Sequence, residues 1–182
     1  MEQREEYIAR IINRPAEHGF TEVKMVNAPQ IQVSRWVRHR CWYLCQNAHG
    51  SDVTPPATPR SDETQEIVDE YKFGVICRKE IGFPFPADFD REWLDFQTAM
   101  IRAENEAFVR GYGKAFTIGV GNCLFGHHDD SLRPCKFEGK KRPTLESVGV
   151  NLYETLNMVG WDAYVVRDPH EPFQVFGLLL LE

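Results

Sequence analysis

Thiol, imidazole and carboxylate side chains crowd into one short stretch of the sequence, from Thr117 to Cys135. A short apolar run at 117–120 ends in Gly-Asn, and the thirteen positions 123–135 then hold six candidate metal ligands: Cys123, His127, His128, Asp129, Asp130 and Cys135. These three kinds of side chain supply most protein ligands to metals. The stretch therefore predicts a metal site just beyond a strand, although it does not indicate a reaction.

A second group of candidate ligands lies in the segment C-W-Y-L-C-Q-N-A-H-G at 41–50. Cys41, Cys45 and His49 are four residues apart, so a helix over this segment would place all three on one face. That arrangement suits a metal ion. The alternative is that the two cysteines are small buried hydrophobic residues next to the aromatic residues of the segment.

The run His127, His128, Asp129 allows two interpretations. With an open coordination position, these side chains could hold a metal whose bound water is activated at neutral pH, as in a zinc-dependent hydrolase or lyase. A solvated loop whose charges face water explains the same residues. General acid/base catalysis without a metal is the weakest of the hypotheses.

Composition and charge narrow the class of protein. The chain has 182 residues, 42% of them hydrophobic, which is enough for one substantial core, so we expect a single domain over 1–182. The formal charge is −6 and the pI is near 5.6. Nucleic acids and anionic membranes bind clustered Lys and Arg, so neither is expected as a partner.

The sequence also predicts a cytoplasmic protein. The first residues are charged and amphipathic, unlike a secretory signal, and no apolar run reaches the roughly 18 residues of a membrane-spanning helix. Five cysteines in such a chain indicate thiols or metal ligands rather than disulfides. Cys77 lies inside an apolar strand pattern, and we expect it to be a core residue.

The spacing of apolar residues predicts alternating helices and strands. Helices are expected within 1–20 and over 63–71, 89–110 and 142–160, with the carboxylates of the long helix, including Glu104, facing solvent. Strands are expected at 22–26, 31–37, 72–77, 117–120, 162–166 and 173–181, the last two forming a hairpin. A Pro-rich loop at 50–62 and a ligand-rich loop at 121–143 complete the chain. Together these elements predict an α/β fold, with α+β as the alternative, in which helices pack on a mixed β-sheet as a single-domain sandwich.

The ordered motifs of the chain resemble those of a cysteine-rich family of predicted metal-binding proteins, domain of unknown function 2284, found mainly in anaerobic bacteria and archaea. The resemblance rests on V-R-H-R-C-W-Y-L-C-Q-N-A-H-G, R-G-Y-G-K-A-F-T-I-G-V-G-N-C, P-C-K-F and K-R-P-T-L-E-S-V-G-V-N-L-Y-E-T. It covers roughly 22–181. It implies a metal or iron–sulfur centre and no known reaction.

The resemblance implies a ligand set. Cys41 and Cys45 match the first cysteine pair of the family, and Cys123 and Cys135 match the outer members of its second group. Four thiolates can hold one tetrahedral zinc ion or one [4Fe–4S] cluster without being adjacent in sequence.

The chain also departs from the family pattern. Three positions that carry cysteine in the family are occupied by Thr54, Gly126 and Asp129. These replacements favour the loss of at least one centre. If a metal is retained, zinc gains ground over a cluster, because His127, His128 or Asp129 would be natural zinc ligands and unusual iron–sulfur ligands.

Three hypotheses of function follow. The first is a metal-binding accessory or electron-transfer protein of anaerobic metabolism that works with a larger enzyme. The second is a metal-free, degenerate family member that serves as a structural or interaction subunit of an enzyme complex. The third is a zinc-dependent hydrolase or lyase. The first two require a protein partner, and the sequence favours an accessory protein or subunit over a stand-alone enzyme.

Overall fold

A four-stranded antiparallel sheet organises the chain, in a computed structural model that describes residues 2–44, 52–82, 89–119, 138–168 and 170–182. The strands follow the order β1-β2-β4-β3 across the sheet. Their bounds are Glu22–Asn27 for β1, Phe73–Ile81 for β2, Phe116–Ile118 for β3 and Phe173–Leu180 for β4. Five α-helices accompany them: α1 Glu2–Asn13, α2 Arg35–Leu44, α3 Ser61–Asp69, α4 Phe89–Val109 and α5 Leu152–Met158.

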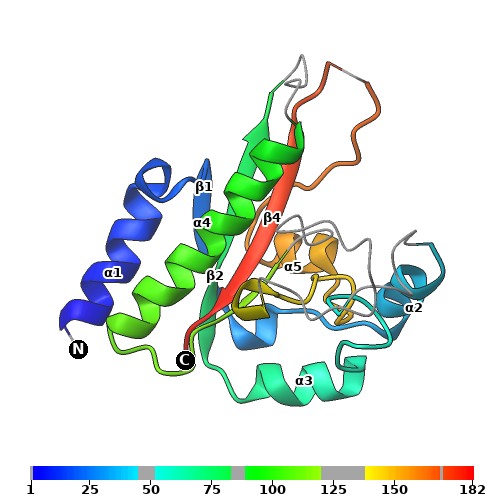
Figure 1. Ribbon diagram of the computed structural model, residues 1–182, viewed down its shortest axis with the longest axis horizontal. Coiled ribbons are helices and arrows are strands. Elements are labelled where there is room, and N and C mark those ends of the chain that lie inside the picture. The colour runs from blue at the N-terminus through cyan, green and yellow to red at the C-terminus, as the bar shows by residue number, and fades with distance from the viewer. Residues whose placement is uncertain (1, 45–51, 83–88, 120–137, 169) are drawn as a thin grey trace.

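Helices cover both faces of this sheet (Figure 1). On one face, α1 and α4 pack on alternate strand residues such as Val75, Cys77 and Leu179. On the other face, the intervening residues, among them Ile76 and Leu178, pack against α3, α5 and the apolar residues of 145–150. Because successive strand side chains point to opposite faces, the parts of the two central strands that are covered on both faces, 74–77 and 175–180, are apolar throughout. This explains the apolar run at 175–181.

The predicted α/β class is confirmed, as are the N-terminal helix, the long helix α4 and the strands β1, β2, β3 and β4. Every pair of neighbouring strands is antiparallel, and within the described ranges parallel pairing is limited to an isolated bridge between Gly119 and Thr144. Cys77 is fully buried in β2, so its prediction as a core residue is also confirmed. Burial raises the pKa of its thiol, which disfavours the thiolate that a metal needs.

Two predictions fail for one shared reason. Residues 31–37 do not form a strand, and the helix expected from 142 begins only at Leu152. Instead, the Ser34 N–H donates to the Gly149 carbonyl and the Asn151 N–H donates to the Gln32 carbonyl, each over 2.7 Å. Residues 32–34 therefore pair with 149–151 over this short contact only, and α2 begins directly after it at Arg35. At the same contact Gly149 has a left-handed φ of 87°, a backbone conformation that interrupts a helix.

The hairpin expected at the end of the chain is also wrong. Residues 162–167 form neither helix nor strand, and β4 pairs with β2 and β3 instead. Tyr164 and Val165 are exposed. The apolar residues at 163–166 therefore do not form a strand of the sheet.

The described ranges contain no helix that is both long enough and apolar enough to span a membrane.

Candidate metal centre

Cys41 is the one predicted ligand within the described residues, and it lies half-buried in α2. The remaining predicted ligands lie outside those residues: Cys45, Cys123, His127, His128, Asp129 and Cys135. Within the described ranges, no group of three or more His, Cys, Asp or Glu side chains is placed to hold a metal ion. The ligand set thus stays a prediction. The structure does describe the residues that flank the segments 45–51 and 120–137 in the sequence, and the contacts between these flanking residues indicate where the two segments begin and end.

The two sides of the ligand-rich segment 120–137 are held next to each other. The Gly119 N–H donates to the Pro143 carbonyl over 2.7 Å, and the Leu145 N–H donates to the Gly119 carbonyl over 3.1 Å. The chain therefore leaves β3 at Gly119 and returns to the same place.

A buried ion pair fixes this junction to α4. Glu104 accepts hydrogen bonds from the Thr117 N–H at 2.7 Å and from Arg142 Nε at 2.8 Å, and its other oxygen pairs with Arg142 Nη2. The residue Glu104 is only 8% exposed. The prediction that this carboxylate faces solvent is wrong, because Glu104 follows Met100 by one helical turn and so lies on the apolar stripe of α4.

The Arg142 guanidinium also binds the chain just before it. Its Nη1 donates to the carbonyl of Gly139 at 3.2 Å and to that of Lys141 at 2.6 Å. One guanidinium therefore connects α4 to the segment that returns from 120–137, and Glu104 extends this connection to Thr117 of β3. Its planar set of donors suits this task, since each N–H points in a fixed direction.

The Pro-rich loop meets the same junction. Asp52 forms an ion pair with Lys141, and the Thr144 N–H donates to the Val53 carbonyl over 3.3 Å. Asp52 directly follows the segment 45–51, which carries Cys45 and His49. Residues that flank the segments 45–51 and 120–137 in the sequence are therefore in contact with each other.

Thr54, where the family resemblance predicts a cysteine, lies in this loop with an exposure of only 1%. The loop, predicted from its proline and polar residues, is partly buried, since Val53, Thr54 and Thr58 are each at most 6% exposed. A metal ion next to this position would offset the effect of burial on the pKa of a thiol, and in this chain the position holds a hydroxyl instead.

Arg38 joins the helix that carries Cys41 to this loop. Its Nε donates to the Pro59 carbonyl at 2.9 Å, and its Nη2 donates to the Thr58 carbonyl at 3.0 Å. Thr58 in turn donates through Oγ1 to the Ser147 carbonyl at 3.0 Å. Because Cys41 follows Arg38 by three residues, it lies one helical turn from this anchor.

A cavity of about 280 Å³ opens at the junction. Its walls come from the Pro-rich loop, α3, β3 and the residues 141–143, and most of the lining side chains are apolar. Nearby, Thr144 and Ser147 exchange hydrogen bonds between their side chains and backbone amides. Burial raises the pKa of the Glu146 carboxyl within this turn, and hydrogen bonds from its own amide and from Thr144 oppose the shift.

The chain matches one protein-family model. The family model described as "Predicted metal-binding protein (DUF2284)" matches residues 24–181. Neither the curated proteins nor the solved structures contain a match to the chain.

Glu104→Gln should lower the free energy of unfolding by about 3 kcal/mol, because it leaves the Arg142 charge buried without a counter-charge. Urea unfolding measures the change. Asp95→Asn, an exposed carboxylate on the same helix, is the matched control and should cost less than about 0.5 kcal/mol. Equal small effects in both variants would show that the ion pair does not hold the junction.

Glu146→Gln should stabilise the protein at neutral pH. A raised native pKa means that the folded protein keeps a proton which the unfolded chain releases, so stability falls as pH rises above the ordinary glutamate pKa of about 4.3. The gain from Gln should be present at pH 7 and shrink toward pH 4 in denaturant titrations. The exposed Glu66→Gln is the control, and a pH-independent gain in Glu146→Gln would contradict the assignment.

Proposed function

This chain belongs to the DUF2284 family of predicted metal-binding proteins, and we propose that it binds one zinc ion or one [4Fe–4S] cluster as an accessory or electron-transfer protein. Its ligands are Cys41, Cys45, Cys123 and Cys135. Zinc would add structural stability, whereas a cluster would accept and donate single electrons. In either case the protein works with a larger enzyme of anaerobic metabolism.

The convergence of the flanking residues is the observation that supports this proposal. Asp52, Gly119 and Lys141–Thr144 are joined by direct hydrogen bonds and an ion pair, although they are far apart in sequence. A four-residue stretch spans at most about 14 Å, which limits the distance of Cys123 from Gly119. Cys135 precedes Glu138 by three residues, a span of at most about 11 Å. These short lengths of chain, together with the contact between Asp52 and Lys141, support a single site for the two thiol pairs.

The number of cysteines that bind the metal would distinguish a zinc ion from a [4Fe–4S] cluster. A [4Fe–4S] cluster takes four thiolates, and the four remaining cysteines suffice only if all of them contribute. Zinc tolerates replacement of a thiolate by imidazole or carboxylate, so His127, His128 or Asp129 could complete its site. We therefore favour zinc if any of the four cysteines proves dispensable.

One observation favours a second candidate function. Thr54 fills a family cysteine position inside the protein, so this position has been given to packing rather than to metal. A chain that lost its metal in this way would keep the fold and act as a structural or interaction subunit of an enzyme complex. Metal content separates the two candidates.

Protein expressed and purified without oxygen should contain stoichiometric zinc or about four irons, measured by elemental analysis and visible absorption. Cys123→Ser should release the metal and lower the melting temperature, because metal binding adds to the folding free energy. Cys77→Ala is the matched control. This thiol is buried in the core, so its loss should lower stability while leaving the metal content unchanged.

Metal retained by Cys123→Ser at the wild-type level would overturn the assigned ligands. Absence of metal from the wild-type protein, together with a specific partner in pull-downs from the native host, would support the interaction subunit instead.

Thr54→Cys should strengthen metal binding, because it returns a thiol to a buried position beside the junction. Competition with a chelator should show the variant holding zinc at least about tenfold more tightly, or should show iron–sulfur absorption that the wild type lacks. Thr58→Cys, in the same loop and also buried, is the control and should change neither measurement. If both variants behave as the wild type, position 54 does not face the metal.

A further inference from the structure

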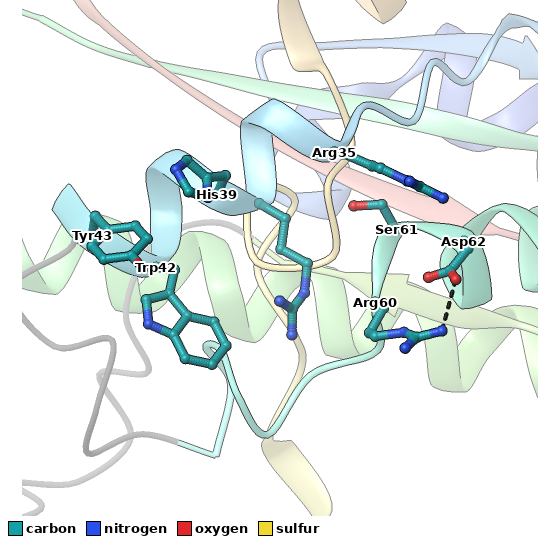
Figure 2. Close-up of a pocket in the computed structure, with 8 residues that line it drawn as sticks. Arg35, His39, Trp42, Tyr43, Arg60, Ser61 and Asp62 are labelled. Atoms are coloured by element: carbon teal, nitrogen blue, oxygen red, sulfur yellow. Dashed lines mark hydrogen bonds and ion pairs between the residues drawn. The ribbon is translucent and has the colours of Figure 1, made fainter.

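A second hollow, of about 600 Å³, lies between α2 and the start of α3. Cationic and aromatic side chains form most of its lining: Arg35, Arg38, Arg60, His39, Trp42 and Tyr43. Figure 2 shows Arg35, His39, Trp42 and Tyr43 on α2, with Arg60, Ser61 and Asp62 at the start of α3. Its size is typical of sites for small ligands.

The hollow is positive although the protein as a whole is acidic. The sequence between Glu22 and Asp52 contains no carboxylate, while α2 alone carries three arginines and a histidine. Arg35 forms no hydrogen bond or ion pair with the residues that the structure describes. Such a concentration of unneutralised charge favours an anion.

The other two arginines differ in how far they are neutralised. Arg38 donates to backbone carbonyls, which position its guanidinium but leave its positive charge in place. Arg60 pairs with Asp62 over 2.7 Å and is therefore largely compensated. The anion would thus be held mainly by Arg35 and Arg38, with His39 as a further donor.

Aromatic side chains stand beside these charges. Arg35, Arg38, His39 and Trp42 follow helical spacing and share one face of α2, and the Arg38 guanidinium lies over the Trp42 ring at 5.6 Å. Tyr43 is 70% exposed at the rim. A half-buried ring at Trp42 and an exposed ring at Tyr43, next to guanidinium groups, suit a flat ligand, because both kinds of group stack on aromatic bases.

We propose that this hollow binds a small molecule that carries a phosphate group next to a flat heteroaromatic ring, as a mononucleotide does. Arg35 and Arg38 would bind the phosphate through charge-assisted hydrogen bonds, and Trp42 and Tyr43 would contact the ring. This site goes beyond the proposed metal function, because it uses none of the four cysteines assigned to the metal. It therefore stands or falls separately from that function.

Isothermal titration calorimetry of the full chain at low salt tests the proposal, with AMP as the probe and adenosine and inorganic phosphate as comparisons. AMP should bind measurably, adenosine should not, and inorganic phosphate should bind more weakly than AMP. Arg35→Gln should weaken AMP binding about tenfold or more, which corresponds to about 1.4 kcal/mol. The fold should be unaffected, because Arg35 makes no polar contact with the described residues.

Arg40→Gln is the matched control. It makes the same change of charge on the same helix, but Arg40 does not line the hollow, so AMP affinity should change less than twofold. Equal weakening by both variants would reduce the effect to general electrostatics and overturn the site. Equal affinity for AMP and inorganic phosphate would overturn the ring-bearing ligand. Binding of polyglutamate without binding of AMP would assign the surface to an acidic protein and overturn the proposal.

Discussion

The ion pair between Glu104 and Arg142 is the interaction on which the candidate metal centre depends. It connects α4, the end of β3 and the residues that follow the ligand-rich segment. A buried carboxylate and guanidinium are costly to remove from water, and they are retained here with most of their hydrogen bonds satisfied. The pair thereby fixes one geometry at the point where the chain leaves and re-enters the sheet.

The two faces of the sheet have different roles. The face covered by α1 and α4 is a closed apolar layer with Phe96 and Met100 fully buried. The other face carries the junction, the buried Pro-rich loop, and α2 with its cationic hollow. Such a division is physically sensible, because a rigid layer on one side lets polar and irregular segments on the other keep defined positions.

Helix α2 connects the two proposed sites. Its Cys41 belongs to the assigned metal ligands, whereas Arg35, Arg38 and Trp42 face the hollow. Arg38 serves both, because its guanidinium anchors the Pro-rich loop and also lines the hollow. A ligand in the hollow would therefore bind the same helix that carries Cys41.

The sequence by itself determined the family, the α/β class and the elements whose burial has a regular period. The apolar stripe of 89–109 and the apolar run at 175–180 could be predicted because each reflects contact with the core along one segment. The strands expected at 31–37 and 162–166 failed, since one is replaced by a short contact between Ser34 and Gly149 and the other is exposed. The cysteine pairs indicated metal-binding chemistry only through residue type and family resemblance.

Only the tertiary structure determined which residues distant in sequence are in contact. The contacts of Asp52 with Lys141, of Val53 with Thr144 and of Glu104 with Arg142 join residues 38 to 91 positions apart. A local pattern reports whether a side chain is buried, but it does not report its partner. The burial of Thr54 and the gathering of Arg35, Arg38 and Trp42 at one hollow therefore became visible only once the chain was folded.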